Sequence, residues 1–250
     1  MRGYDDTSYG EAIADVYDEW YADLDDVALV VATLLDLAGD GPVLELGVGT
    51  GRLAVPLAAA AVDAGRDDLR VTGIDTSQAM LGRLALKPGG DLVTAVLGDM
   101  VDGLPDGPFS LAFVAYNTFF ALHGEERQAA AFRAVAERLH TGGRFLVEAF
   151  VPAADAPADE VALRSLAADR VVLSISRSDP ASQRAEGQFV EFTESGGVRL
   201  RPWSIHWASP AQLDEMAAGA GLVLEHRWAG MDRAPFDESA TRHVSVYRRP

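Results

Sequence analysis

The sequence PVLELGVGTGRLAVPLA, residues 42–58, joins a short apolar run to a helical pattern through Gly47, Gly49 and Gly51. The apolar run predicts a buried strand, and the spacing of the later apolar residues predicts a helix. Glycine lets the backbone turn sharply and approach a ligand closely, while the start of a helix offers free N–H groups. The stretch therefore predicts a ligand-binding turn beyond the carboxyl end of a strand.

The spacing of the glycines argues against two common nucleotide sites. A dinucleotide fingerprint that starts at Gly47 needs its third glycine at position 52, where this chain has Arg52. The P-loop pattern G-x-x-x-x-G-K-[ST] is also absent from this turn. An NAD(P)-linked oxidoreductase on a similar scaffold is therefore disfavoured but stays an alternative.

Strand-like runs alternate with helical patterns through the first 150 residues. Strands are expected within residues 42–48, 69–76, 91–99, 109–117 and 144–150. Helices are expected within residues 9–38, where a second run begins at Val27, and within residues 51–65, 77–86 and 125–140. The strands are mostly continuous apolar runs, which is typical of a parallel sheet covered on both faces. Right-handed crossovers then give a doubly wound, mostly parallel α/β sheet.

The pattern changes after Phe150. A Pro/Ala-rich connection at residues 151–160 precedes strand-like runs, and ESGG at residues 194–197 predicts a hairpin turn. We expect an inserted β-hairpin or small antiparallel sheet here. Ser209, followed by Pro210 and Gln212, predicts a capped helix, and two further strand-like runs close the chain.

Composition limits the classes of function. The 250 residues carry a formal net charge of −17, which disfavours nucleic acid or an anionic membrane as the main partner. The chain has no cysteine, so metal sites built on sulfur are excluded, and we predict no metal. No apolar leader or membrane-spanning run is apparent, and the expected location is cytoplasmic.

The turn resembles the first motif of the class I S-adenosylmethionine (SAM)-dependent methyltransferases, an acid followed by G-x-G-x-G, at LELGVGTGRL with Glu45 as the acid. The likeness continues in GIDTSQAML, which ends a predicted strand at Asp75, in LGDM with Asp99, and in AYNTF with Tyr116 and Asn117. The resemblance implies a Rossmann-like, seven-stranded sheet with an antiparallel C-terminal strand. It also implies SAM as cofactor and S-adenosylhomocysteine (SAH) as product.

The resemblance assigns roles to individual residues. Asp75 would accept hydrogen bonds from the ribose hydroxyls, Asp99 would bind the adenine amino group, and Glu45 would reach the cofactor's ammonium. Each acid has a structural alternative: a helix cap for Asp75, a turn acid for Asp99 and a capped loop amide for Glu45. Further predicted cofactor-binding residues are Gly47, Gly49, Arg52, Thr76, Met80, Gly98, Met100, Tyr116 and Asn117.

VYDEWY places Tyr17 and Tyr21 four residues apart, on one face of a predicted helix. They could pack on the sheet as core. Sugar-amine methyltransferases of the family have a similar pattern near the sulfonium, which implies a lid whose tyrosine rings face a cation. We accordingly predict that both tyrosines bind the cofactor.

The predicted acceptor side combines a catalytic candidate with binding candidates. His123 is the candidate general base or orienting group, with a loop or capping histidine as the alternative. The predicted substrate-binding residues are Glu148, Glu191, Arg201, Trp203 and His206.

These expectations define one methyltransferase domain, residues 1–250. It comprises a helical lid (1–40), a cofactor-binding core (41–150), an inserted hairpin that covers the substrate or forms an interface (168–208), and a C-terminal helix with edge strands (209–250). We predict transfer of a methyl group from SAM to nitrogen or oxygen of a small molecule, with a homodimer possible. A non-catalytic SAM-binding or interaction protein is the alternative from another class.

Overall fold

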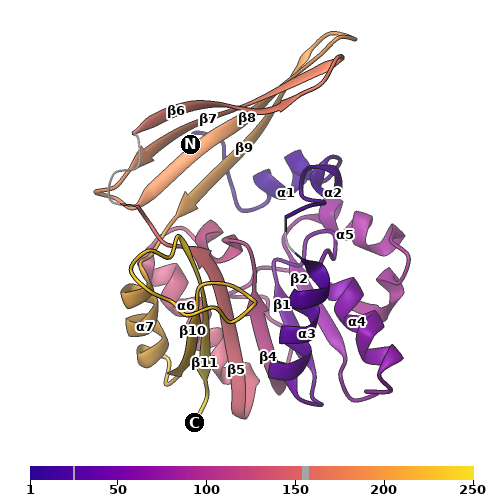
Figure 1. The fold of residues 1–250 in the computed structure, drawn as a ribbon, viewed down its shortest axis with the longest axis vertical. Helices are drawn as coiled ribbons and strands as arrows, with labels where there is room; N and C mark the ends of the chain where they lie inside the picture. Colours follow the sequence, from indigo (N-terminus) through magenta and orange to yellow (C-terminus); the bar gives the residue numbers. More distant parts are fainter. Residues whose placement is uncertain (25, 154–157) are drawn as a thin grey trace.

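A seven-stranded sheet forms the centre of the computed structural model, which describes residues 1–24, 26–153 and 158–250. Its strand order is β10-β11-β5-β4-β1-β2-β3 (Figure 1). The strands are β1 (Val43–Leu46), β2 (Val71–Asp75), β3 (Val93–Leu97), β4 (Phe109–Val114), β5 (Leu139–Phe150), β10 (Val223–Trp228) and β11 (Arg242–Arg248). Strands β1 to β5 pair in parallel, whereas β11 is antiparallel to both β5 and β10. The predicted fold class is confirmed.

Helices cover both faces of this sheet. α3 (Val27–Ala38) and α4 (Ala54–Asp63) pack in a core cluster on one face, and α6 (Glu125–Arg138) and α7 (Pro210–Gly219) pack in a cluster on the other. α5 (Gln78–Leu86) follows β2, and two 3-10 helices are η1 (Gly90–Leu92) and η2 (Thr118–Ala121). The predicted cap of α7 is confirmed, because the Ser209 hydroxyl and the Gln212 side chain each accept the other residue's backbone N–H.

A second sheet, which we call the arm, lies above the core in Figure 1. Its antiparallel strands are β6 (Asp159–Leu166), β7 (Arg170–Asp179), β8 (Arg184–Thr193) and β9 (Val198–His206). The predicted turn at residues 194–197 joins β8 to β9. The arm is larger than a hairpin, because β6 begins inside the stretch expected to be a connection. Residues 154–157 of that stretch lie outside the described part of the chain.

Two other boundaries differ from expectation. The first helical run, expected from residue 9, is divided into α1 (Ser8–Ile13) and α2 (Tyr17–Trp20), whereas the second run, expected from Val27, is confirmed as α3. β5 begins at Leu139, directly after α6, although the glycines at 142 and 143 suggested a loop. The strand runs through these glycines because β11 and the residue after it pair with this part of the chain, and the Gly142 N–H donates to the Arg249 carbonyl.

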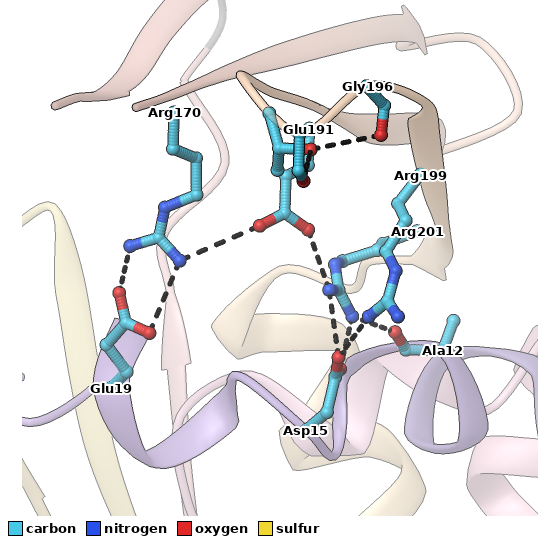
Figure 2. A network of polar contacts seen from close by, with 10 residues as sticks. Ala12, Asp15, Glu19, Arg170, Glu191, Gly196, Arg199 and Arg201 are labelled. Atoms are coloured by element: carbon cyan, nitrogen blue, oxygen red, sulfur yellow. Dashed lines mark hydrogen bonds and ion pairs between the residues drawn. The ribbon is translucent and has the colours of Figure 1, made fainter. Parts of the chain in front are cut away.

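Charged side chains tie α1 and α2 to the underside of the arm (Figure 2). The Arg201 guanidinium, on β9, bonds Asp15 and the Ala12 carbonyl, and lies 2.8 Å from a Glu191 carboxylate oxygen. Arg170, on β7, pairs with Glu19 on α2. The network holds the N-terminal segment between arm and core, where it can close a cleft.

Candidate active site

A cleft of about 290 Å³ lies where the core, the N-terminal segment and the arm meet. Its core side is formed by residues at the carboxyl ends of β1, β2, β3 and β4, which is the expected binding edge of such a sheet. The predicted site residues that line it are Tyr17, Tyr21, Gly47, Gly49, Asp75, Thr76, Met80, Gly98, Asp99, Met100, Tyr116, Asn117 and Trp203. The structure therefore brings most of the predicted cofactor residues to one place.

The glycine turn is held against β2 by backbone hydrogen bonds. The N–H groups of Gly47 and Val48 donate to the Ile74 carbonyl, at 2.8 and 3.0 Å. Gly47 and Gly49 have φ of 67° and 55°, in the left-handed region that favours glycine. Both line the cleft, so this part of its wall is bare backbone.

Asp75 is the last residue of β2, and its carboxylate both accepts backbone hydrogen bonds and lines the cleft. Its oxygens accept the N–H groups of Gly49, at 2.8 Å, and Ser77, at 2.9 Å. Burial raises the pKa of Asp75, and these backbone donors oppose the shift. Asp75 thus orders the turn before α5, whose N-cap is Ser77, and the same carboxylate also faces the cleft. Its contact with a ribose remains a prediction.

Asp99 follows β3 and is also held by its own loop. Its carboxylate accepts the Val101 N–H, at 2.7 Å, and the Asp102 N–H, at 3.0 Å, and it pairs with Arg127 at 2.8 Å. The turn-acid alternative is therefore observed. Asp99 lines the cleft as well, so the predicted adenine contact stays compatible with its position.

Glu45 lies on β1 behind the residues that line the cleft, with its side chain buried. It accepts the N–H of Ala54 at the start of α4, while its Oε2 has no hydrogen-bond partner among the described residues. Burial raises the pKa of Glu45 to about 8, although the nearby Arg52 guanidinium lowers it. A buried, unpartnered carboxyl oxygen beside the glycine turn fits a cationic group such as the ammonium of SAM.

Tyrosine rings form the N-terminal wall of the cleft. The rings of Tyr17 and Tyr21 lie 4.7 Å apart, Tyr21 lies 5.7 Å from Tyr116, and the hydroxyls of Tyr9 and Tyr21 are 3.2 Å apart. Burial raises the pKa of Tyr17 to about 12, so this phenol stays neutral at physiological pH. On the other side, the arm adds Phe189 and Trp203, whose rings are 6.4 Å apart.

A strained turn places Tyr116 and Asn117 at the cleft. Their φ values of 48° and 63° lie in the left-handed region, which non-glycine residues seldom adopt outside functional sites. Glu148, on β5, accepts the Tyr116 N–H at 3.2 Å, and the Asn117 amide oxygen accepts the Phe150 N–H at 2.7 Å. Glu148 thus positions the turn and does not itself line the cleft.

Several predicted residues lie away from the cleft. Glu191 and Arg201 belong to the network of Figure 2. Arg52 interacts with Tyr17 and Glu45 outside the cleft lining. The buried Nδ1 of the His206 ring has no hydrogen-bond partner in the described part of the chain, while the His206 backbone carbonyl accepts from the Gln128 side chain.

His123 contacts the site only indirectly. Its ring lies edge-on to the ring of Tyr4, 6.1 Å between centroids, and Tyr4 lines the cleft. Burial lowers the pKa of His123, which is therefore neutral at pH 7. His123 itself does not line the cleft, so its predicted catalytic role requires an acceptor that extends past Tyr4 to the His123 ring.

Sequence reasoning missed several cleft residues from distant parts of the chain. They are Tyr4, Asp6, Thr118, Phe150 and Phe189. Phe189 lies on β8, and no residue pattern indicates which face of that strand turns towards the core. Among the described residues, no cluster of histidine, aspartate and glutamate could hold a metal ion, and no helix is long and apolar enough to cross a membrane.

Comparison with known proteins identifies the fold and the family. Residues 43–143 match the family described as a methyltransferase domain. The CcbJ methyltransferase from Streptomyces caelestis is 40% identical, with a TM-score of 0.88 over 98% of this chain and 99% of that one. A SAM-dependent methyltransferase from Clostridium acetobutylicum has a TM-score of 0.77 at 13% identity, over 94% and 97% of the two chains, which shows the shared fold. A comparison with curated protein sequences returns no match.

The chain belongs to the SAM-dependent methyltransferases. Its cofactor is SAM, whose complexes are known for relatives of this fold such as CalS10 from Micromonospora echinaspora, with a TM-score of 0.63 at 19% identity over 100% and 93% of the chains.

Proposed function

We propose that the protein transfers the methyl group of SAM to a nitrogen or oxygen of a small molecule, and that an amine nitrogen is the natural acceptor. The preference for nitrogen comes from the ionisable side chains in the cleft. Among the described residues that line the cleft, the ionisable side chains are only tyrosines and the aspartates Asp6, Asp75 and Asp99.

This set offers little help to a hydroxyl acceptor, which must lose a proton to become a good nucleophile. Asp75 and Asp99 already accept backbone N–H bonds, Asp6 is exposed so that water competes for its carboxylate, and burial raises the pKa of Tyr9 and Tyr17, so neither phenol ionises at neutral pH. A neutral amine attacks through its lone pair and needs mainly alignment and exclusion of water. The enclosed aromatic cleft supplies both.

The cofactor-side residues have separate tasks under this proposal. Gly47 and Gly49 would let the ribose and methionine parts pack on bare backbone, Asp75 would accept from the ribose, and Glu45 would stabilise the ammonium. SAM supplies an electrophilic methyl group on a sulfonium, and the sulfide leaves as SAH. Tyrosine rings beside the cleft stabilise positive charge and keep water away.

Names of relatives are consistent with an amine acceptor. KedS8 from Streptoalloteichus is described as a sugar N-methyltransferase, with 19% identity and a TM-score of 0.63 over 100% of this chain and 90% of that one. MtfA is described as a glycopeptide N-methyltransferase, with 21% identity and a TM-score of 0.61. At this identity they support the fold, and their acceptors only suggest a class to test.

The test is a transfer assay with SAM that carries an isotope-labelled methyl group. Glucosamine and cyclohexylamine are the amine probes, and glucose and cyclohexanol are the matched alcohols. We expect label on nitrogen, detected by NMR, and none on oxygen. Label on oxygen alone would contradict the amine assignment, and SAH binding without any transfer would favour the non-catalytic alternative.

A further inference from the structure

A second cavity, of about 370 Å³, adjoins the cleft. Tyr4, Asp6 and Ser204 line both spaces, so the two are direct neighbours. The rest of its wall comes from the N-terminal segment, from His123 after η2, and from β7 and β8 of the arm. Its volume falls in the range of small-molecule pockets, roughly 300–1,000 Å³.

Most charges in this wall are already satisfied within the protein. Arg177 pairs with Asp159 at 3.0 Å, and the Asp179 carboxylate accepts the Ser182 hydroxyl at 2.6 Å. Asp5 accepts the hydroxyls of the threonine and serine that follow it, and these hydrogen bonds lower its pKa. Such groups need no ligand.

Three groups in the same wall are left over. The side chains of Asp6, His123 and Arg184 form no hydrogen bond or ion pair with any residue that the structure describes. Asp6 supplies acceptors, Arg184 supplies donors, and a neutral His123 supplies one of each. The set combines one negative and one positive charge, so its net charge is zero.

We propose that this cavity binds a neutral, hydroxyl-bearing part of the acceptor, such as a sugar ring, while the amine of the same molecule reaches past Tyr4 into the cleft. This inference rests on the proposed function. A hydroxyl can donate to the Asp6 carboxylate and accept from the Arg184 guanidinium, and hydrogen bonds to ionised partners are the strong ones.

Other ligand chemistries fit this wall less well. An apolar group would strip water from a carboxylate and a guanidinium without replacing their hydrogen bonds, which is unfavourable. An anionic group would meet the free Asp6 carboxylate, and a cationic group would meet Arg184. A neutral group with hydroxyls on adjacent carbons satisfies both charges together.

The direct test is binding of methyl glucoside to the SAH-saturated protein, followed by ligand-observed NMR. We expect binding to the wild type and weakening by about tenfold in Arg184→Ala, from the loss of a charged hydrogen bond. Arg133→Ala is the matched control, because Arg133 is exposed on α6 and does not line this cavity. No binding to the wild type, or equal weakening in both variants, would overturn the proposal.

A transfer assay separates this proposal from the proposed function. We expect Arg184→Ala to reduce the ratio of kcat/KM for glucosamine to kcat/KM for cyclohexylamine by about tenfold, and Arg133→Ala to preserve it. If the protein methylates cyclohexylamine but does not bind methyl glucoside, the cavity assignment is wrong and the proposed N-methylation is still supported. Glucoside binding that depends on Arg184, without transfer to any amine, would keep the cavity and refute the amine acceptor.

Discussion

Glu45→Gln removes the charge of the buried acid beside the glycine turn while keeping its shape. In the ligand-free protein, burial raises the pKa of Glu45 to about 8, so the carboxyl is mostly protonated at pH 6. A carboxylate that stabilises the cofactor's ammonium must be ionised. At pH 6, two units below this pKa, ionisation costs about 3 kcal/mol, and SAH should bind roughly a hundredfold more weakly than at its best pH.

Calorimetry of SAH binding between pH 6 and pH 8 tests this coupling. Affinity should rise with pH, and titrations in two buffers of different ionisation enthalpy should show about one proton released per SAH near pH 6. Glu45→Gln should abolish both effects. A flat affinity in the wild type, or the same pH dependence in the variant, would refute the anchoring role of Glu45.

The same pKa predicts a stability effect of defined sign. An acid whose pKa is raised on folding binds its proton more tightly in the folded state, so stability falls as pH rises from the unfolded value, about 4.3, towards about 8. Between pH 6 and pH 8 the ligand-free wild type should therefore lose about 2 kcal/mol that Glu45→Gln retains. Urea denaturation at the two pH values measures this, and equal losses would show that Glu45 is already ionised at pH 6.

Four further variants test other parts of the structure. Asp75→Ala should weaken SAH by about 1–3 kcal/mol through loss of buried hydrogen bonds, and unchanged affinity by calorimetry would remove Asp75 from the cofactor site. Arg201→Met should destabilise the protein by about 3 kcal/mol in urea denaturation, because the buried Glu191 carboxylate loses its nearer cation and keeps only Arg170, at 3.6 Å. Arg177→Gln, which breaks an exposed pair on the arm, should cost less than about 1 kcal/mol, and similar losses in the two variants would contradict a buried network. His123→Gln should lower turnover without changing SAH affinity, and wild-type turnover would assign His123 a structural role.

The cofactor side of the site could be predicted because it follows from the order of parallel strands. Each of Glu45, Asp75, Asp99 and Asn117 lies in or just after a strand of the same sheet, and parallel strands end at one edge. Local sequence therefore placed these residues together without knowledge of any long-range contact.

The acceptor side could not be predicted in the same way. Tyr4 and Phe189 meet at the cleft only because α1 and α2 dock under the arm, and that docking depends on pairings such as Arg201 with Asp15, far apart in sequence. Likewise β6 is an edge strand with a mostly exposed face, so it lacks the apolar run that revealed the other strands. Glu191 and Arg201 have the chemistry of a binding pair, and only the packing shows that they bind each other.

A crystal structure of the SAH complex would place the cofactor and the acceptor space in a single experiment. We expect SAH along Gly47 and Gly49, its ribose at Asp75, and its sulfur facing the tyrosine wall that includes Tyr17, with open space towards Trp203 for an acceptor. SAH bound elsewhere, or in the cleft with its sulfur turned away from both the tyrosines and the arm, would contradict this placement.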